Sequence, residues 1–156
     1  MIIYKNQNIL LDDSKYICHQ CNCISSDSAG LAKNLFDKYP YADTYKGRGS
    51  RKPDILGKID VKGNGENQRY VINMYAQFYP GKSGYAGDSK VDRIYAFESC
   101  LEEIKKIEDI VSISFPEGVG CGLAGGDWQT YLGLISNFAF DITRKGAKVF
   151  ICRYTK

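Results

Sequence analysis

Apolar and polar positions along the chain predict strands and helices in alternation. Short apolar runs of strand character cover residues 2–10, 15–22, 56–62, 69–76, 110–115 and 148–154. Apolar residues at helical spacing predict helices over residues 28–39, 89–107 and 128–140. Strands separated by helices favour a three-layer α/β/α domain with a mixed central sheet.

Two segments, residues 15–39 and 110–140, have the form strand, polar or glycine-rich loop, helix. In open α/β sheets, ligands bind beyond the carboxyl ends of the strands. We therefore expect a site built from these two loops.

Length and composition favour one soluble domain over residues 1–156. The chain is 44% hydrophobic and 25% charged, with a formal net charge of +3, and its length suits a single core. This mild charge does not favour a nucleic-acid binder, which usually carries a concentrated basic stripe. The densest basic stretch runs from Lys46 to Lys58 and includes Arg48, Arg51 and Lys52; we expect it to be a solvated loop.

Targeting signals are not evident in the sequence. The chain contains no run of about eighteen apolar residues, which a membrane span would need. The N-terminal segment MIIYKNQNILL lacks the basic region and long apolar run of a signal peptide. The six cysteines form no regular framework, so we expect reduced thiols and a cytoplasmic location.

Residues 115–128, FPEGVGCGLAGGDW, contain five glycines, and Gly120 to Gly125 match the pattern G-x-G-x-x-G. A Rossmann site also needs an acidic residue at the end of the next strand. That strand ends instead in Arg153 and Tyr154, followed by Lys156. A Walker A loop is excluded too, because no Lys-Ser or Lys-Thr follows the glycines.

The physical basis of a phosphate-binding loop nevertheless remains at this segment. Small residues allow backbone N–H groups to converge on an anion, and a helix N-terminus adds partial positive charge. The alternative is an ordinary turn in which glycines supply unusual dihedral angles.

The first loop begins with a cluster of possible metal ligands: Cys18, His19, Cys21 and Cys23. Alternate side chains of a strand point to opposite faces, and a zinc site usually draws on two separated ligand pairs. We therefore predict no metal site and no cofactor. Cys18 or Cys21 is expected to pack in the core.

Together the two loops resemble those of the macro domain, the ADP-ribose-binding module. The segment Asn22-Cys23-Ile24-Ser25 followed by Ser28-Ala29-Gly30-Leu31-Ala32 is similar to the first loop of the family. The proline followed by GVGCGLAGGDW is similar to its second loop and is the most specific part. The segments YKNQNIL and VINMYAQ occupy the places of the family's opening and central strand, so the resemblance covers nearly the whole chain.

This resemblance implies a set of ADP-ribose contacts. The adenine would lie near Asn8 and Ile9, the pyrophosphate between the two loops, and the distal ribose near Asn22 and Ser25. The implied contacts of the loops are Ser28, Ala29, Gly30 and Leu31 in the first, and Gly118, Val119, Gly120, Cys121, Gly122 and Leu123 in the second.

The chain departs from the family pattern at several positions. Asn8 stands where the family has an acidic residue, and Ser25 where it has a second asparagine. One branch that removes ADP-ribose from glutamate uses a lysine and an aspartate, and at the matching positions this chain has Met74 and Ala124. The lysine mechanism is therefore not supported. The H-x-C-N-C signature is most similar to the branch that hydrolyses ADP-ribose 1″-phosphate.

Three residues are candidates for the chemistry, each with a structural alternative. His19 is a candidate general acid or base, or a histidine satisfied inside the sheet. Asp127 could orient a water molecule or cap the helix from Trp128. Asn22 could contact the distal ribose or form a turn. Phe78 and Tyr79 could stack on a base or ribose, or simply pack in a loop.

The expected function is binding of ADP-ribose with hydrolysis of ADP-ribose 1″-phosphate. One alternative is removal of ADP-ribose from modified macromolecules, in which case a nucleic acid could take part as the modified substrate. Another is a reader that binds ADP-ribose without catalysis. The sequence does not set the oligomeric state.

Overall fold

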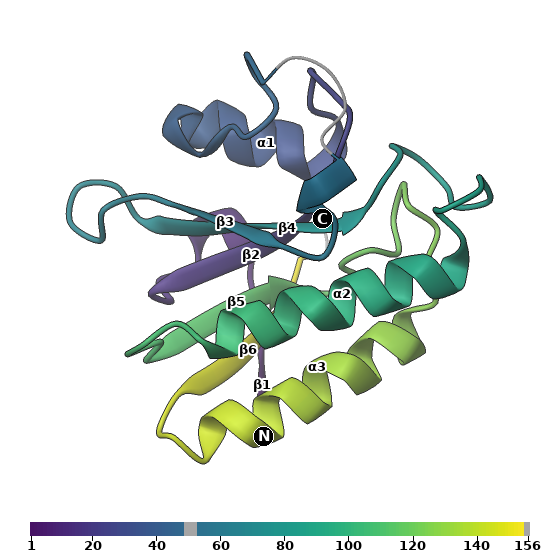
Figure 1. Cartoon of the computed structure of the whole chain (residues 1–156). Helices are drawn as coiled ribbons and strands as arrows, with labels where there is room; N and C mark the ends of the chain where they lie inside the picture. Colours follow the sequence, from purple (N-terminus) through teal and green to yellow (C-terminus); the bar gives the residue numbers. More distant parts are fainter. Residues whose placement is uncertain (49–52, 155–156) are drawn as a thin grey trace.

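The computed structural model describes residues 1–48 and 53–154, which form one mixed sheet with helices on both sides (Figure 1). The strands are β1 (Ile2–Asn6), β2 (Tyr16–Asn22), β3 (Ile59–Lys62), β4 (Tyr70–Gln77), β5 (Ser112–Pro116) and β6 (Lys148–Arg153). The α-helices are α1 (Gly30–Lys38), α2 (Lys90–Lys105) and α3 (Trp128–Thr143). Short 3-10 helices span Ile9–Leu11, Pro40–Ala42 and Pro53–Ile55.

The strand order is β1-β6-β5-β2-β4-β3. All neighbouring pairs are parallel except β3 with β4. The carboxyl ends of β2, β4 and β5 therefore lie at the same edge of the sheet. At that edge the β2–β4 register shifts between Cys21 and Asn22. The predicted mixed α/β sheet is confirmed.

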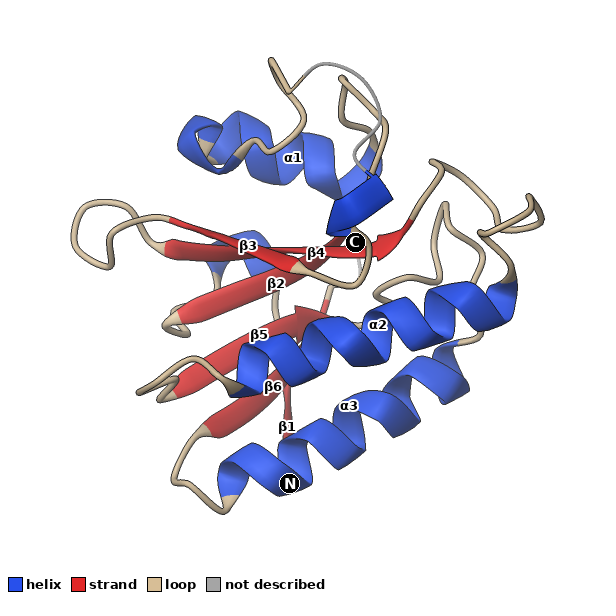
Figure 2. Cartoon of the chain, in the orientation of Figure 1, coloured by secondary structure: helices blue, strands red, loops and turns tan. Residues whose placement is uncertain are grey.

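Two apolar cores lie on opposite faces of the sheet (Figure 2). Helices α2 and α3 cover one face, where Phe97 and Phe138 are buried with Phe115 of β5. Helix α1 covers the other face, where Leu35 and Phe36 pack with the opposite side of β2. This arrangement confirms the three layers.

Some predicted boundaries are wrong by a few residues. The strand predicted over residues 2–10 ends at Asn6, because the side chain of Asn8 accepts a hydrogen bond from Leu10 N and starts a 3-10 helix. Helix α1 begins at Gly30 instead of Ser28. At the start of α2, Ser89 and Asp92 form a capping box.

The cysteines and the basic stretch can be placed in this fold. All six cysteines are unpaired, and every one except Cys121 is buried. Arg51, Lys52 and Lys156 lie outside the described residues. Within residues 1–48 and 53–154, no helix has the length and apolar character that a membrane crossing requires.

Candidate functional site

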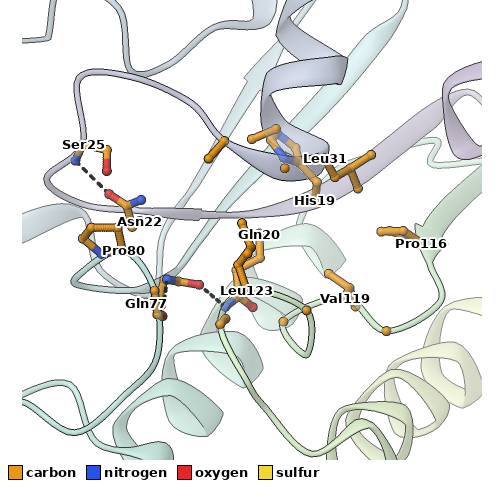
Figure 3. A pocket seen from close by; sticks show the side chains of 18 of the residues that line it. His19, Gln20, Asn22, Ser25, Leu31, Gln77, Pro80, Pro116, Val119 and Leu123 are labelled. Carbon is orange, nitrogen blue, oxygen red and sulfur yellow. Dashed lines mark hydrogen bonds between the residues drawn. The ribbon is translucent and has the colours of Figure 1, made fainter.

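A cavity of about 420 Å³ opens at the carboxyl ends of β2, β4 and β5 (Figure 3). Three segments surround it: residues 23–29, the first loop; residues 78–88, the third loop; and residues 117–126, the glycine loop. It is lined by His19, Gln20, Asn22, Ser25, Asp27, Ala29–Ala32, Tyr45, Gln77, Pro80, Gly81, Pro116–Gly120 and Gly122–Ala124. The two loops expected from the sequence thus face one another.

The glycine loop offers a row of backbone N–H groups to the cavity. The N–H groups of Val119 and Cys121 bond to the carbonyls of Pro116 and Gly118, at 3.1 and 2.8 Å. Five other amides of this loop, all from cavity-lining residues, have no acceptor within the described chain; they belong to Gly118, Gly120, Gly122, Leu123 and Ala124. Convergent donors of this kind bind anions.

The N-terminus of α1 faces the glycine loop from the other side of the cavity. Its N-cap residue is Ala29, and no side chain caps the helix. The first N–H groups of a helix have no partner inside the helix and carry the positive end of its dipole. Ser25, Ser26 and Asp27 lie too far before the helix, which begins at Gly30, to act as its N-cap.

Glycine is required where the two loops approach one another. Gly30 has a φ of +59°, and a Cβ atom there would lie 3.0 Å from Leu123 Cδ1. Gly120 has a φ of +77°, and its Cβ would lie 2.7 Å from Gln20 Oε1 and 3.2 Å from the Tyr131 ring. A side chain at either position would push the walls of the cavity apart.

No Lys or Arg lines the cavity within the described part of the chain, and its charged side chains are the carboxylates of Asp27 and Glu117. An anion in this cavity would therefore be held by backbone N–H dipoles rather than by ion pairs. This arrangement fits phosphate groups that bind at helix N-termini and glycine loops.

The side chain of Asn22 is held in one orientation, because its carbonyl oxygen accepts hydrogen bonds from neighbouring residues. Oδ1 accepts hydrogen bonds from Ile24 N at 3.1 Å, Ser25 N at 2.8 Å and an Arg48 nitrogen at 3.4 Å. The amide Nδ2 has no partner among the described residues, and Asn22 lines the cavity. Asn22 can therefore donate a hydrogen bond to a ligand, but its oxygen cannot act as a base.

Arg48 differs from the solvated residue expected from the sequence. Its Nε donates to Ser25 O at 2.9 Å, and its guanidinium lies over the Tyr45 ring, 4.6 Å from the centroid. The hydroxyl oxygen of Tyr45 in turn accepts a hydrogen bond from Asn22 N at 2.9 Å. Through these hydrogen bonds, Arg48 and Tyr45 hold the first loop in place.

His19 lies at the inner wall of the cavity but is only 1% exposed. Its Nε2 is 2.5 Å from Asn73 Oδ1, and its ring meets the Phe36 ring edge to face. Burial lowers the pKa of His19 from 6.5 to about 4, although the hydrogen bond to Asn73 acts in the opposite direction. The imidazole is therefore neutral near pH 7.

The floor of the cavity contains a pair of glutamine amides (Figure 3). Gln77 Nε2 donates to Tyr79 O at 2.8 Å and Gly81 O at 3.4 Å. Its Oε1 accepts from Gln20 Nε2 at 2.7 Å. These bonds fix the orientation of both amides and connect β2 to the third loop.

Most of the predicted contact residues line the cavity, and a smaller group lies elsewhere. The first group comprises His19, Asn22, Ser25, Ala29, Gly30, Leu31, Gly118, Val119, Gly120, Gly122 and Leu123. The second comprises Asn8, Ile9, Ser28, Cys121 and Asp127.

Four of the five residues away from the cavity make structural contacts in this chain. Asn8 caps the 3-10 helix, and Ile9 is buried in the core beneath α1. Cys121 turns its thiol back to Val119 O at 3.4 Å. Asp127 is the N-cap of α3, where its carboxylate accepts from Thr130 N at 3.2 Å and Thr130 Oγ1 at 2.7 Å.

Sequence reasoning named Phe78 and Tyr79 of the third loop but missed Gln77 of β4 and Pro80 and Gly81 of that loop, which line the cavity. Met74, matched by position to a catalytic lysine, is fully buried in the core under α2 and α3. The residue of β4 that lines the cavity is Gln77, at the end of the strand. Gln77 could have been identified by the same rule that identified Asn22, since each residue stands at the carboxyl end of an apolar parallel strand.

The cysteines and histidine of β2 do not assemble a metal site. Across residues 1–48 and 53–154, no three His, Cys, Asp or Glu side chains lie together in a way that could hold a metal ion. Cys18 faces the core of α2 and α3, whereas Cys21 faces the core of α1.

Comparison with known proteins relates the chain to a group of similar folds. No protein-family profile matches it. It is 23% identical over 137 residues to an uncharacterized 17.5 kDa protein of the tk-vs intergenic region in Enterobacteria phage T4, with 83% of each chain covered.

Solved structures align along nearly the whole chain. The macrodomain of Mycobacterium tuberculosis DarG superposes with a TM-score of 0.74 at 20% identity, over 97% of both chains. That of Thermus aquaticus DarG gives 0.71 at 19%, over 100% of this chain and 99% of the other. An Oceanobacillus iheyensis macrodomain variant solved with ADPR gives 0.62 at 11%, over 99% and 85%.

Proposed function

We propose that this chain, which has the macrodomain fold, binds ADP-ribose in the cavity between its first loop and its glycine loop. The pyrophosphate would lie between the N-terminus of α1 and the glycine loop. The solved macrodomain with ADPR supports this choice of ligand, as does the resemblance of both loops.

The observation that carries the proposal is the set of amides around the cavity that have no acceptor among the described residues. Five amides of the glycine loop and the uncapped start of α1 face the same space. A diphosphate has enough acceptor oxygens for such donors, and no cationic side chain competes within the described lining. Asn22 Nδ2 would donate to the distal ribose.

We further propose that the protein catalyses the hydrolysis of ADP-ribose 1″-phosphate in this cavity. Water attacks phosphorus, the bond from phosphorus to the 1″ oxygen breaks, and that oxygen takes up a proton. The backbone donors would stabilise the phosphoryl charge. His19 is neutral and closed in by Asn73, so the carboxylates of Asp27 and Glu117 are the lining groups left for proton transfer.

A non-catalytic ADP-ribose reader is the second candidate function. It is favoured by the positions of His19, which is enclosed, and Asp127, which caps α3 instead of lining the cavity. Neither side chain is placed to act on a substrate.

One pair of assays on the same sample tests both proposals. ADP-ribose binding is measured by titration calorimetry, and phosphate release is measured with ADP-ribose 1″-phosphate. Gly120→Glu should abolish binding, because its side chain would fill the cavity against Gln20 and Tyr131. Gly133→Glu is the matched control: Gly133 is an exposed residue of α3 with no atoms within 4 Å of its Cβ position.

The outcomes separate the candidates. Absence of wild-type binding at millimolar ADP-ribose would exclude both proposals. Binding without phosphate release would leave the reader. Equal affinity of wild type and Gly120→Glu would show that the ligand lies outside this cavity.

A further inference from the structure

Arg93 lies in the first turn of α2 and is only 3% exposed, although its side chain is charged. It is not one of the residues that line the cavity. It pairs with Asp88, which is 1% exposed. Arg93 Nε donates to Asp88 Oδ1 at 2.9 Å, and Arg93 Nη2 donates to Asp88 Oδ2 at 2.7 Å. The two side chains form a buried, two-pronged ion pair.

Asp88 also fixes the beginning of the third loop. Its two carboxylate oxygens accept from Phe78 N and Tyr79 N, each at 3.1 Å. Both ends of the third loop are therefore tied to a single side chain. The ion pair and these two amide bonds use the acceptor positions of the carboxylate fully.

The remaining donors of Arg93 join two walls of the cavity. Nη1 donates to Gly81 O at 2.7 Å in the third loop and to Ala124 O at 3.3 Å in the glycine loop. Nη2 donates to Tyr79 O at 3.2 Å. Gly81 and Ala124 both line the cavity. The guanidinium thus connects the third loop to the glycine loop, although it does not itself line the cavity.

Two of these carbonyl groups also accept hydrogen bonds from Gln77, one of the two glutamines of the cavity floor. Tyr79 O and Gly81 O accept from Gln77 as well as from Arg93. Gln77 continues the network to Gln20. One connected set of hydrogen bonds therefore runs from the glycine loop through the third loop to β2.

We propose that Arg93, held by Asp88, is a positioning residue for ligand binding: it keeps the glycine loop and the third loop in the arrangement that accepts the ligand. This inference rests on the proposed ADP-ribose site. A lysine cannot replace it, because an ammonium group lacks the planar five-donor fork that reaches three carbonyls and a carboxylate together. When the competent arrangement is only partly populated, apparent affinity falls by the same fraction.

Arg93→Lys tests the proposal, with Arg69→Lys as the matched control. Arg69 also donates to two main-chain carbonyls, those of Asp12 and Ser14, but these precede β2 at the opposite end of the sheet. Calorimetry gives the Kd for ADP-ribose, and urea unfolding gives the stability of each variant under the same conditions. We expect Arg93→Lys to bind about tenfold more weakly and Arg69→Lys to bind within about twofold of wild type.

A residue with a purely structural role would lower the urea midpoint and leave the Kd of the folded protein unchanged. Equal Kd values for folded Arg93→Lys and Arg69→Lys would therefore overturn the proposal. If Arg93→Lys does not fold, Asp88→Asn takes its place, with the same expected loss and the same contradicting result. Failure of the wild type to bind would count against the ADP-ribose site itself, before any variant is compared.

Discussion

The imidazole of His19 is enclosed by groups from distant parts of the chain. Asn73 comes from β4, Phe36 from α1, and the thiol of Cys21 lies 3.6 Å from Nε2. The sequence showed a single histidine before a strand end and left acid, base and structural roles open. Its hydrogen-bond partner Asn73 lies 54 residues away, and no local pattern reports such a contact.

His19 should make the stability of the protein depend on pH. The folded state lowers the His19 pKa from 6.5 to about 4, so between these values the unfolded chain binds a proton that the folded chain does not. Stability therefore falls as pH drops through this window. We expect wild type to lose roughly 1–2 kcal/mol more than His19→Gln between pH 7 and pH 5, in urea unfolding. Identical pH dependence of the two proteins would contradict this account.

At the scale of elements, helix starts were predictable only where a side chain caps them. The capping box of Ser89 and the N-cap Asp127 are local patterns, and both helices begin at the expected residue. Helix α1 has no side-chain cap. Its start depends on the first loop, which Arg48 holds through Ser25 O from 23 residues away, so the sequence placed it too early.

Substitutions at Asp127 separate the cap from catalysis. Asp127→Ala should lower the free energy of unfolding by about 1 kcal/mol through loss of the cap, and Asp127→Ser should restore most of it. Both variants should retain wild-type phosphate release and ADP-ribose affinity, because the carboxylate does not line the cavity. Urea unfolding and the two assays check this. Loss of phosphate release in a stable Asp127→Ser would instead assign a catalytic role.

At the scale of the whole molecule, parallel pairing brings the loops together. Because β2 and β5 are parallel neighbours in the sheet, Asn22 and the glycine loop meet at the carboxyl ends of the strands, where ligands bind in open α/β sheets. The position of the third loop does not follow from this topology, because it depends on the Arg93–Asp88 pair. Asp88 lies in the loop before α2 and Arg93 in the first turn of that helix, and the local sequence shows no pattern that marks them as partners.

A second cavity, of about 490 Å³, can be compared with the proposed site by its position in the sheet. It is lined by residues 105–111 together with Ile142 and residues 145–147. These segments precede β5 and β6, so the second cavity lies at the amino ends of the strands. The proposed site lies at their carboxyl ends.

Amide chemical shifts during an ADP-ribose titration test the central claim most directly. In ¹H–¹⁵N spectra of the wild-type protein, we expect the largest changes at Gly118, Gly120, Gly122, Leu123 and Ala124, whose N–H groups lack acceptors in the described structure. The first turn of α1 should shift with them, while residues 105–111 stay unchanged. Saturating shifts around the second cavity, or an unchanged glycine loop, would contradict the account.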